Sequence, residues 1–153
     1  MTAQKTVQKA EFEQPKLVYI GIMSTIGFLG TRGVNLWDTW GSQFNTNLEF
    51  FVGGRNLSDE KREILNQSRL PIHVLENVDD GVYPPQKKSF YMVNHMIRNK
   101  VKNYRWFIRG DDDLFVNREK LESFLRSINE TRPLIFGSPG TGVVEDDLNV
   151  NQG

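Results

Sequence analysis

Residues 104–115 read YRWFIRGDDDLF and join two halves of opposite character. The apolar run at 106–108 is typical of a strand that is buried on both faces. Three consecutive carboxylates, Asp111, Asp112 and Asp113, follow it. Acids crowded at the end of a buried strand repel one another, and a divalent cation removes that repulsion. Because carboxylate oxygens suit Mg²⁺ and Mn²⁺, the stretch predicts a metal site, with a solvated acidic turn as the alternative.

The composition is that of one globular domain. The chain has 153 residues, of which 38% are hydrophobic and 25% charged, so it can build a packed core. The formal net charge is zero, which does not favour nucleic acid as a partner. The absence of cysteine excludes disulfides and thiolate zinc sites. No apolar run approaches the roughly 20 residues of a membrane span.

Apolar runs alternate with segments of helical periodicity along the chain. We expect strands at 17–23, 48–52, 72–75, 105–109 and 133–137. We expect helices at 31–44, at 58–67 with Ser58 as its N-cap, at 86–100, and after Asn117 as a further N-cap. This alternation predicts βαβ units, and therefore an α/β fold with a mainly parallel sheet flanked by helices.

The inward faces of two helices can be predicted from spacing. In the helix at 86–100, Phe90, Val93 and Ile97 mark the expected inner stripe, with two methionines nearby. After Asn117, apolar residues recur at i, i+3, i+4 and i+7, which predicts a second amphipathic helix.

The basic and imidazole side chains are interpreted as structural. A solvated turn is favoured over phosphate contact for Lys87 and Lys88. His73 lies inside an expected strand, and we interpret it as structural or exposed rather than as a ligand. His95 is expected on a helix surface.

Two polar clusters follow strands that should end at the same edge of the sheet. One is the small-residue loop at 24–33, and the other is the acidic triplet. Ligands of open parallel sheets bind at the carboxyl ends of strands. Backbone amides and Arg32 can meet phosphate oxygens from one side, and a metal held by the acids can meet them from the other. The loop matches neither the P-loop nor the GxGxxG pattern, so the hypothesis is a metal-bound diphosphate ligand.

The same residues resemble a known family. WFIRGDDDLFV at 106–116 resembles the strand and DxD motif of metal-dependent, GT-A-type glycosyltransferases of the fringe and galactosyltransferase group. DDGVYPPQKKSFYM at 79–92 resembles the amino-terminal domain of chondroitin synthases and chondroitin-polymerising factors. The blocks at 31–41 and 121–142 resemble that domain too. The resemblance implies a Rossmann-like nucleotide-sugar-binding half at 17–142, after a flexible lead-in at 1–16 and before an unstructured tail at 143–153.

The resemblance also implies an activity and its residues. The family transfers a hexose, here glucuronic acid, from a UDP-sugar to a growing glycosaminoglycan chain such as chondroitin, using Mn²⁺ or Mg²⁺. By this analogy Asp113 is the principal metal ligand, and Asp111 faces the metal and the ribose. Asp112 supports the donor sugar. Thr31 and Arg32 correspond to a pair near the nucleotide.

Members of the group continue beyond the expected fifth strand with acceptor-side strands, a further metal-binding histidine and a general base. We therefore expect an incomplete transferase whose general base lies beyond Gly153. The resemblance places it in the Golgi lumen as part of a type II membrane protein, although residues 1–16 lack the apolar centre of a signal peptide. Sequons at Asn56, Asn66 and Asn129 agree weakly with a secretory compartment. The alternative is a non-catalytic subunit that binds a partner synthase.

Overall fold

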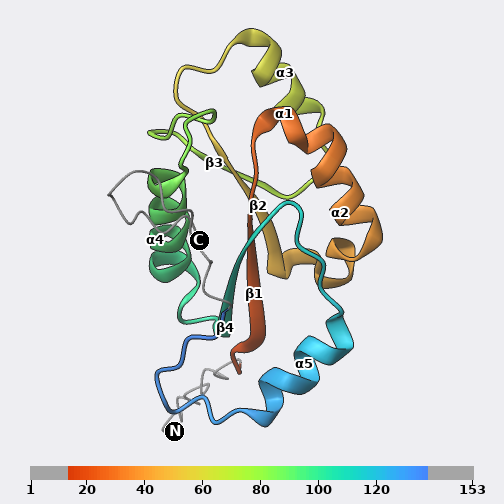
Figure 1. The fold of residues 1–153 in the computed structure, drawn as a ribbon, viewed down its shortest axis with the longest axis vertical. Helices are drawn as coiled ribbons and strands as arrows, with labels where there is room; N and C mark the ends of the chain where they lie inside the picture. Colours follow the sequence, from red (N-terminus) through yellow and green to blue (C-terminus); the bar gives the residue numbers. More distant parts are fainter. Residues whose placement is uncertain (1–13, 138–153) are drawn as a thin grey trace, which may run out of the picture.

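A parallel four-stranded sheet forms the centre of the computed structural model, which describes residues 14–137 (Figure 1). Its strands are β1 (Lys16–Met23), β2 (Leu48–Gly53), β3 (Ile72–Leu75) and β4 (Tyr104–Asp111). They lie in the order β3-β2-β1-β4, and every neighbouring pair is parallel. The predicted α/β class is confirmed, and four of the five expected strands are present. Lys16, expected in the lead-in, is the first residue of β1.

The helical segments connect these strands. They are α1 (Ile26–Phe28), η1 (Leu29–Gly33), α2 (Val34–Thr39), η2 (Gly41–Asn47), α3 (Asp59–Gln67), α4 (Gln86–Lys100) and α5 (Arg118–Ser127). Both predicted N-caps form, since Ser58 accepts a hydrogen bond from the Lys61 amide and Asn117 accepts one from the Lys120 amide. Among residues 14–137, no helix combines the length and the apolar character needed to cross a membrane.

The single helix expected at 31–44 is instead a series of short helical segments that begins at Ile26. Glycines recur within this stretch, and glycine is a weak helix former. The α2 segment ends at Thr39, and its C-cap residue Trp40 has a φ of −142°, which is not helical. Trp40 nevertheless points into the core, as expected for a large aromatic residue, and is 2% exposed.

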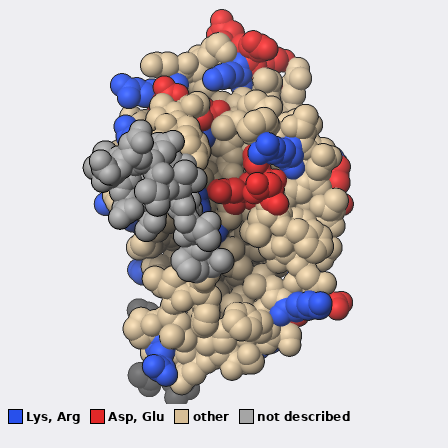
Figure 2. All heavy atoms as spheres, viewed as in Figure 1, with Lys and Arg blue, Asp and Glu red and all other residues tan. Residues whose placement is uncertain are grey.

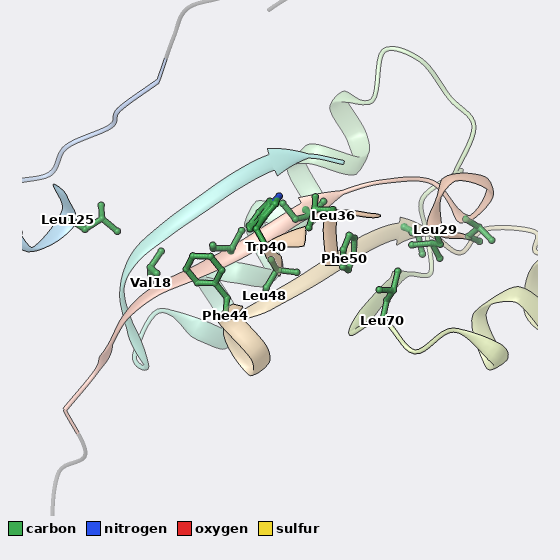
Figure 3. Close-up of a cluster of buried hydrophobic side chains, with 13 residues drawn as sticks. Val18, Leu29, Leu36, Trp40, Phe44, Leu48, Phe50, Leu70 and Leu125 are labelled. Carbon is green, nitrogen blue, oxygen red and sulfur yellow. The ribbon is translucent and has the colours of Figure 1, made fainter. Parts of the chain in front are cut away.

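The sheet is covered on both faces. On one face, α1, α2 and α5 bury a cluster that includes Trp40, Phe50 and Leu125 (Figures 1 and 3). On the other face, α4 packs against a cluster that includes Tyr19 and Phe51. The central strand β1 is therefore buried on both sides, as its continuous apolar sequence predicts.

The inner face predicted for α4 was wrong. Phe90 and Ile97 are 67% and 57% exposed, whereas Met92, Met96 and Lys88 are buried. The methionines lie over Gly21 of β1, where a Cβ atom would be 2.5 Å from Met92 Cε. Flexible thioether side chains fill the irregular space above this glycine. The helix is thus rotated so that its outer face carries aromatic and branched residues.

The fifth strand predicted at 133–137 was also wrong, because this segment is exposed and pairs with no strand. Its apolar contacts are made by Phe136, whose ring lies 5.5 Å from Phe124 of α5 and 6.1 Å from Trp106 of β4, between centroids. Packing between side chains, rather than a backbone ladder, accounts for the apolar run. The expected tail at 143–153 and most of the lead-in lie outside the described residues.

The order of the strands creates a switch point between β1 and β4. The chain proceeds from β1 through β2 to β3 on one side, and β4 then pairs with the opposite edge of β1. At the carboxyl ends of these two strands, Met23 is paired with Asp111. Ligands of open α/β sheets bind in the crevice at such a point. The two polar clusters identified in the sequence therefore begin side by side.

Gly53, at the end of β2, is packed tightly against the backbone of the loop that contains Asp80. A Cβ atom there would lie 2.6 Å from both N and Cα of Asp80. Because backbone atoms cannot move aside easily, Gly53→Ala is expected to lower the free energy of unfolding by about 1–3 kcal/mol in urea titrations. Gly30→Ala is the matched control, since a Cβ atom there meets nothing within 4 Å. Equal effects of the two substitutions would contradict this packing.

Candidate functional site

The acidic triplet is divided by the end of β4. Asp112 is buried, with 9% of its surface exposed, whereas Asp111 and Asp113 are exposed. The Leu114 amide donates a hydrogen bond to the carbonyl oxygen of Asp111, which closes a turn around the triplet. The two outer carboxylates are thus available to a ligand, and the middle one is part of the protein interior.

Asp112 connects β4 to the loop that follows β1. The Ser24 hydroxyl donates a hydrogen bond of 2.6 Å to Asp112 Oδ2, and Arg32 Nη1 lies 3.2 Å from Asp112 Oδ1. The Arg32 guanidinium also lies over the Phe28 ring, 4.2 Å from its centroid. Both oxygens of Asp112 therefore have protein partners, and the residue fixes the distance between the two polar clusters.

Asp111 makes a weaker interaction. Arg109 Nη2 lies 3.2 Å from Asp111 Oδ1, and the two side chains are 38% and 52% exposed. An exposed pair of this kind contributes little to stability, because water screens it. The Asp111 carboxylate can therefore exchange this partner for a ligand at small cost.

A cavity of about 310 Å³ lies where these groups meet. Its lining includes Ser24, Thr25, Phe28 and Arg32 from the segment after β1, Asp111–Asp113 after β4, and Asp80, Tyr83, Pro85 and Lys88 from the loop and helix after β3. Figure 2 shows acidic side chains beside basic side chains near the middle of the face that it draws. The predicted residues Arg32, Asp111, Asp112 and Asp113 are thus brought together.

Thr31 is the exception among the predicted site residues. It is exposed and does not line the cavity, and its hydroxyl donates a hydrogen bond of 3.4 Å to the Phe28 carbonyl oxygen. Its neighbour Arg32 provides the side chain that reaches the acids.

The floor of the cavity contains a buried ion pair that sequence reasoning missed. Lys88 Nζ donates hydrogen bonds to Asp80 Oδ1 at 2.9 Å, to the Asp80 carbonyl at 2.9 Å and to the Ser24 carbonyl at 2.8 Å. The two side chains are only 4% and 5% exposed. The prediction of a solvated turn was therefore wrong for Lys88, whereas Lys87 is exposed as expected.

Asp80 accepts two further hydrogen bonds, both from backbone amides. Ile26 donates to Oδ2 and Gly53 donates to Oδ1, each at 2.7 Å. The pair thus joins the carboxyl ends of β1 and β2 to the amino-terminal end of α4. No spacing rule identifies it, because the partners are eight residues apart across a proline-containing loop.

Comparison with known proteins identifies the family of the chain. The model of the Fringe-like family matches residues 13–146, which include β1–β4 and the whole cavity. The chain belongs to the Fringe-like family. The resemblance to the fringe group is thereby confirmed.

This Fringe-like chain is also similar to curated proteins. It is 39% identical over 131 residues to chondroitin sulfate synthase 3 of Mus musculus and 38% identical over 131 residues to that of Homo sapiens. Each match covers 84% of this chain but only 14% of the relative, so the chain spans about one seventh of their length. No solved structure matches it.

The buried pair in this Fringe-like domain gives a stability prediction. Lys88→Met keeps most of the side-chain volume but leaves the Asp80 carboxylate buried without its cation. Breaking a buried pair in this way costs about 3–5 kcal/mol, which urea unfolding would measure.

The matched control is the exposed pair of Arg69 and Asp38, whose atoms are 2.6 Å apart. Arg69→Ala should cost less than about 1 kcal/mol, since exposed pairs contribute little. If Lys88→Met were no more harmful than Arg69→Ala, the structural role assigned to the buried pair would be wrong.

Proposed function

We propose that this chain forms the donor-binding part of a metal-dependent glycosyltransferase of glycosaminoglycan synthesis, which takes a UDP-sugar. The observation that carries this proposal is the cavity at the β1–β4 switch point. There, the exposed carboxylates of Asp111 and Asp113 and the guanidinium of Arg32 line one space of about 310 Å³. Membership of the Fringe-like family supports the same conclusion.

The side chains fit a hard divalent cation. Asp111 and Asp113 offer exposed carboxylate oxygens, the ligands that Mn²⁺ and Mg²⁺ prefer. Such a cation, when bound, neutralises the negative charge of a diphosphate leaving group. Asp112 would hold the loop that follows β1 in place. It would support the donor sugar only with the outer edge of its carboxylate, because Ser24 and Arg32 already occupy its oxygens.

Arg32 is suited to the opposite side of the diphosphate. A guanidinium group carries five N–H donors, and the contact with Asp112 engages a single nitrogen, Nη1. The remaining donors can bind phosphate oxygens, and Phe28 holds the guanidinium plane from one side. Thr31 would contribute through its position beside the nucleotide rather than through the cavity wall.

The name of the relatives bears on the acceptor that we propose. Their name, chondroitin sulfate synthase 3, supports a chondroitin or related glycosaminoglycan acceptor, and glucuronic acid is the donor sugar that we propose. The reaction would invert the anomeric centre, and its general base would come from a part of the protein outside residues 14–137. The Golgi lumen is the compartment in which such a chain would act.

One observation favours a non-catalytic role as the second candidate. Phe90, Val93 and Ile97 form an exposed apolar stripe along α4, and such surfaces often bind other proteins. A subunit that supports a partner synthase would use this face. Association with a synthase, combined with no sugar transfer to a chondroitin oligosaccharide, would favour this role.

Ligand-dependent melting tests the donor site. UDP and Mn²⁺ together should raise the melting temperature, whereas UDP alone should not. At a ligand concentration one hundred times Kd, the gain is about 2.7 kcal/mol. For a domain of this size, that gain corresponds to about 5–10 °C. Asp113→Asn should abolish the shift, because it removes a charged metal ligand.

Glu60→Gln is the control, since it neutralises an exposed acid on α3 outside the cavity. This variant should keep the full shift. An unchanged melting temperature at millimolar UDP and Mn²⁺, or an equal shift in Asp113→Asn, would refute the proposal.

A further inference from the structure

Three side chains with metal-binding groups meet on the α4 side of the sheet, away from the acidic cavity. They are Glu49 from β2, His73 from β3 and His95 from α4. Each offers one ligand atom, and these atoms all lie within 4.8 Å of one another. The chain contains only two histidines, and the fold brings both of them to this cluster.

The imidazole rings of His73 and His95 are packed against each other and against the ring of Phe51. The centroids of His73 and His95 are 3.7 Å apart, and both rings lie against Phe51 at 5.2 and 5.4 Å. His95 Nε2 is buried and has no hydrogen-bond partner within the described residues. A buried polar atom of this kind is uncommon and calls for an explanation, such as an ion.

The spacing suits a shared cation better than direct hydrogen bonds. His95 Nε2 lies 4.0 Å from Glu49 Oε2, which is too far for a hydrogen bond. A zinc ion with bonds of about 2.0–2.2 Å holds its ligand atoms about 3.4 Å apart. The ligand atoms lie within 4.8 Å of one another, so each pair is at most about 1.4 Å wider than that separation.

Lys100 prepares the carboxylate for this role. Its Nζ lies 2.5 Å from Glu49 Oε1, which leaves Oε2 directed toward the histidines. Burial alone would raise the pKa of Glu49, but the interactions with Lys100, Tyr19 and His95 together outweigh burial, so the pKa is lowered. Glu49 is therefore an anion at neutral pH.

The histidines are also in the form that binds metal. Burial lowers the pKa of both His73 and His95, and the neighbouring His73 lowers that of His95 further. The charge of Lys100 also lowers each pKa, whereas Glu49 acts in the opposite direction. Neutral imidazole is the ligand form, so no proton has to be displaced from an imidazolium at neutral pH.

The Asn99 side chain lies beside Nδ1 of the His95 ring. Its Nδ2 atom is 3.2 Å from His95 Nδ1 and 3.1 Å from the His95 carbonyl oxygen. Ligation through Nε2 leaves the ring proton on Nδ1. The exposed Asn99 side chain can then turn its amide oxygen to accept that proton, as partners of ligating histidines commonly do.

We propose that Glu49, His73 and His95 form a zinc site that is separate from the acidic cavity. Two imidazole nitrogens and one carboxylate oxygen suit Zn²⁺ better than Mn²⁺ or Mg²⁺, and three protein ligands leave a fourth position open. A surface hollow of about 340 Å³, lined in part by His73, His95 and Asn99, adjoins the cluster and can admit water to that position. The ion would fasten α4 to β2 and β3, and so hold the helix that carries Lys88.

Calorimetric titration of the chelator-treated chain with Zn²⁺ at pH 7.5 tests the proposal. One ion should bind per chain, and Zn²⁺ should raise the melting temperature. His73→Ala and His95→Ala should each weaken binding more than about 100-fold, the upper range for losing an outer partner of a ligand. Gln86→Ala, on the same helix but outside this hollow, is the control and should leave the affinity unchanged.

Cobalt gives a second measurement that needs no variant. Co²⁺ bound by the unaltered chain should produce the intense visible absorption of four-coordinate cobalt, and added Zn²⁺ should remove it. The histidine variants should keep the Mn²⁺-dependent UDP shift, which separates this site from the donor site. Absence of Zn²⁺ binding, zinc affinity unaltered in both histidine variants, or a six-coordinate cobalt spectrum would each overturn the proposal.

Discussion

The buried pair of Asp80 and Lys88 is the interaction on which the rest of the site depends. A buried charge is tolerated only when its partners are fixed, and here the partners are the ends of strands. The Asp80 carboxylate holds the amides of Ile26 and Gly53, and Lys88 holds the carbonyl oxygen of Ser24. The loop after β1, the end of β2 and the start of α4 are thereby fixed relative to one another.

The four aspartates that line the cavity form two sets, one buried and one exposed. Asp80 and Asp112 are buried, and each of their carboxylate oxygens has a protein donor, so they shape the walls. Asp111 and Asp113 are exposed, and the one ion pair of Asp111, with Arg109, is itself screened by water, so both carboxylates are accessible to a ligand. Arg32 lies between the buried and the exposed acids, since it contacts the buried Asp112 while half of its own side chain is exposed. This arrangement explains why three adjacent aspartates can have different roles.

The prediction that the apolar run at 106–108 is buried on both faces was wrong, because β4 lies at the edge of the sheet and this run is only partly buried. Sequence patterns nevertheless predicted four of the strands, because β1 and β2 are apolar runs that the sheet buries. They also located Arg32 and the acidic triplet at one edge, because parallel strands end together. The rotation of α4 could not be predicted, since helical spacing fits two overlapping stripes and the choice depends on the space above Gly21. The apolar run at 133–137 was ambiguous for a related reason, as its contacts are with Phe124 and Trp106. Lys88 was missed because its partner is defined only by the folded loop.

Paramagnetic broadening of backbone amide signals by Mn²⁺, in the presence of UDP, tests the central claim most directly. The account predicts that signals from 24–32 and from 109–114 broaden together at substoichiometric Mn²⁺. Signals of Lys16 and Leu17, at the opposite end of β1 and about 20 Å from Met23, should remain sharp. Broadening at the acidic triplet alone, or at neither segment, would contradict a cation held between the triplet and the loop after β1.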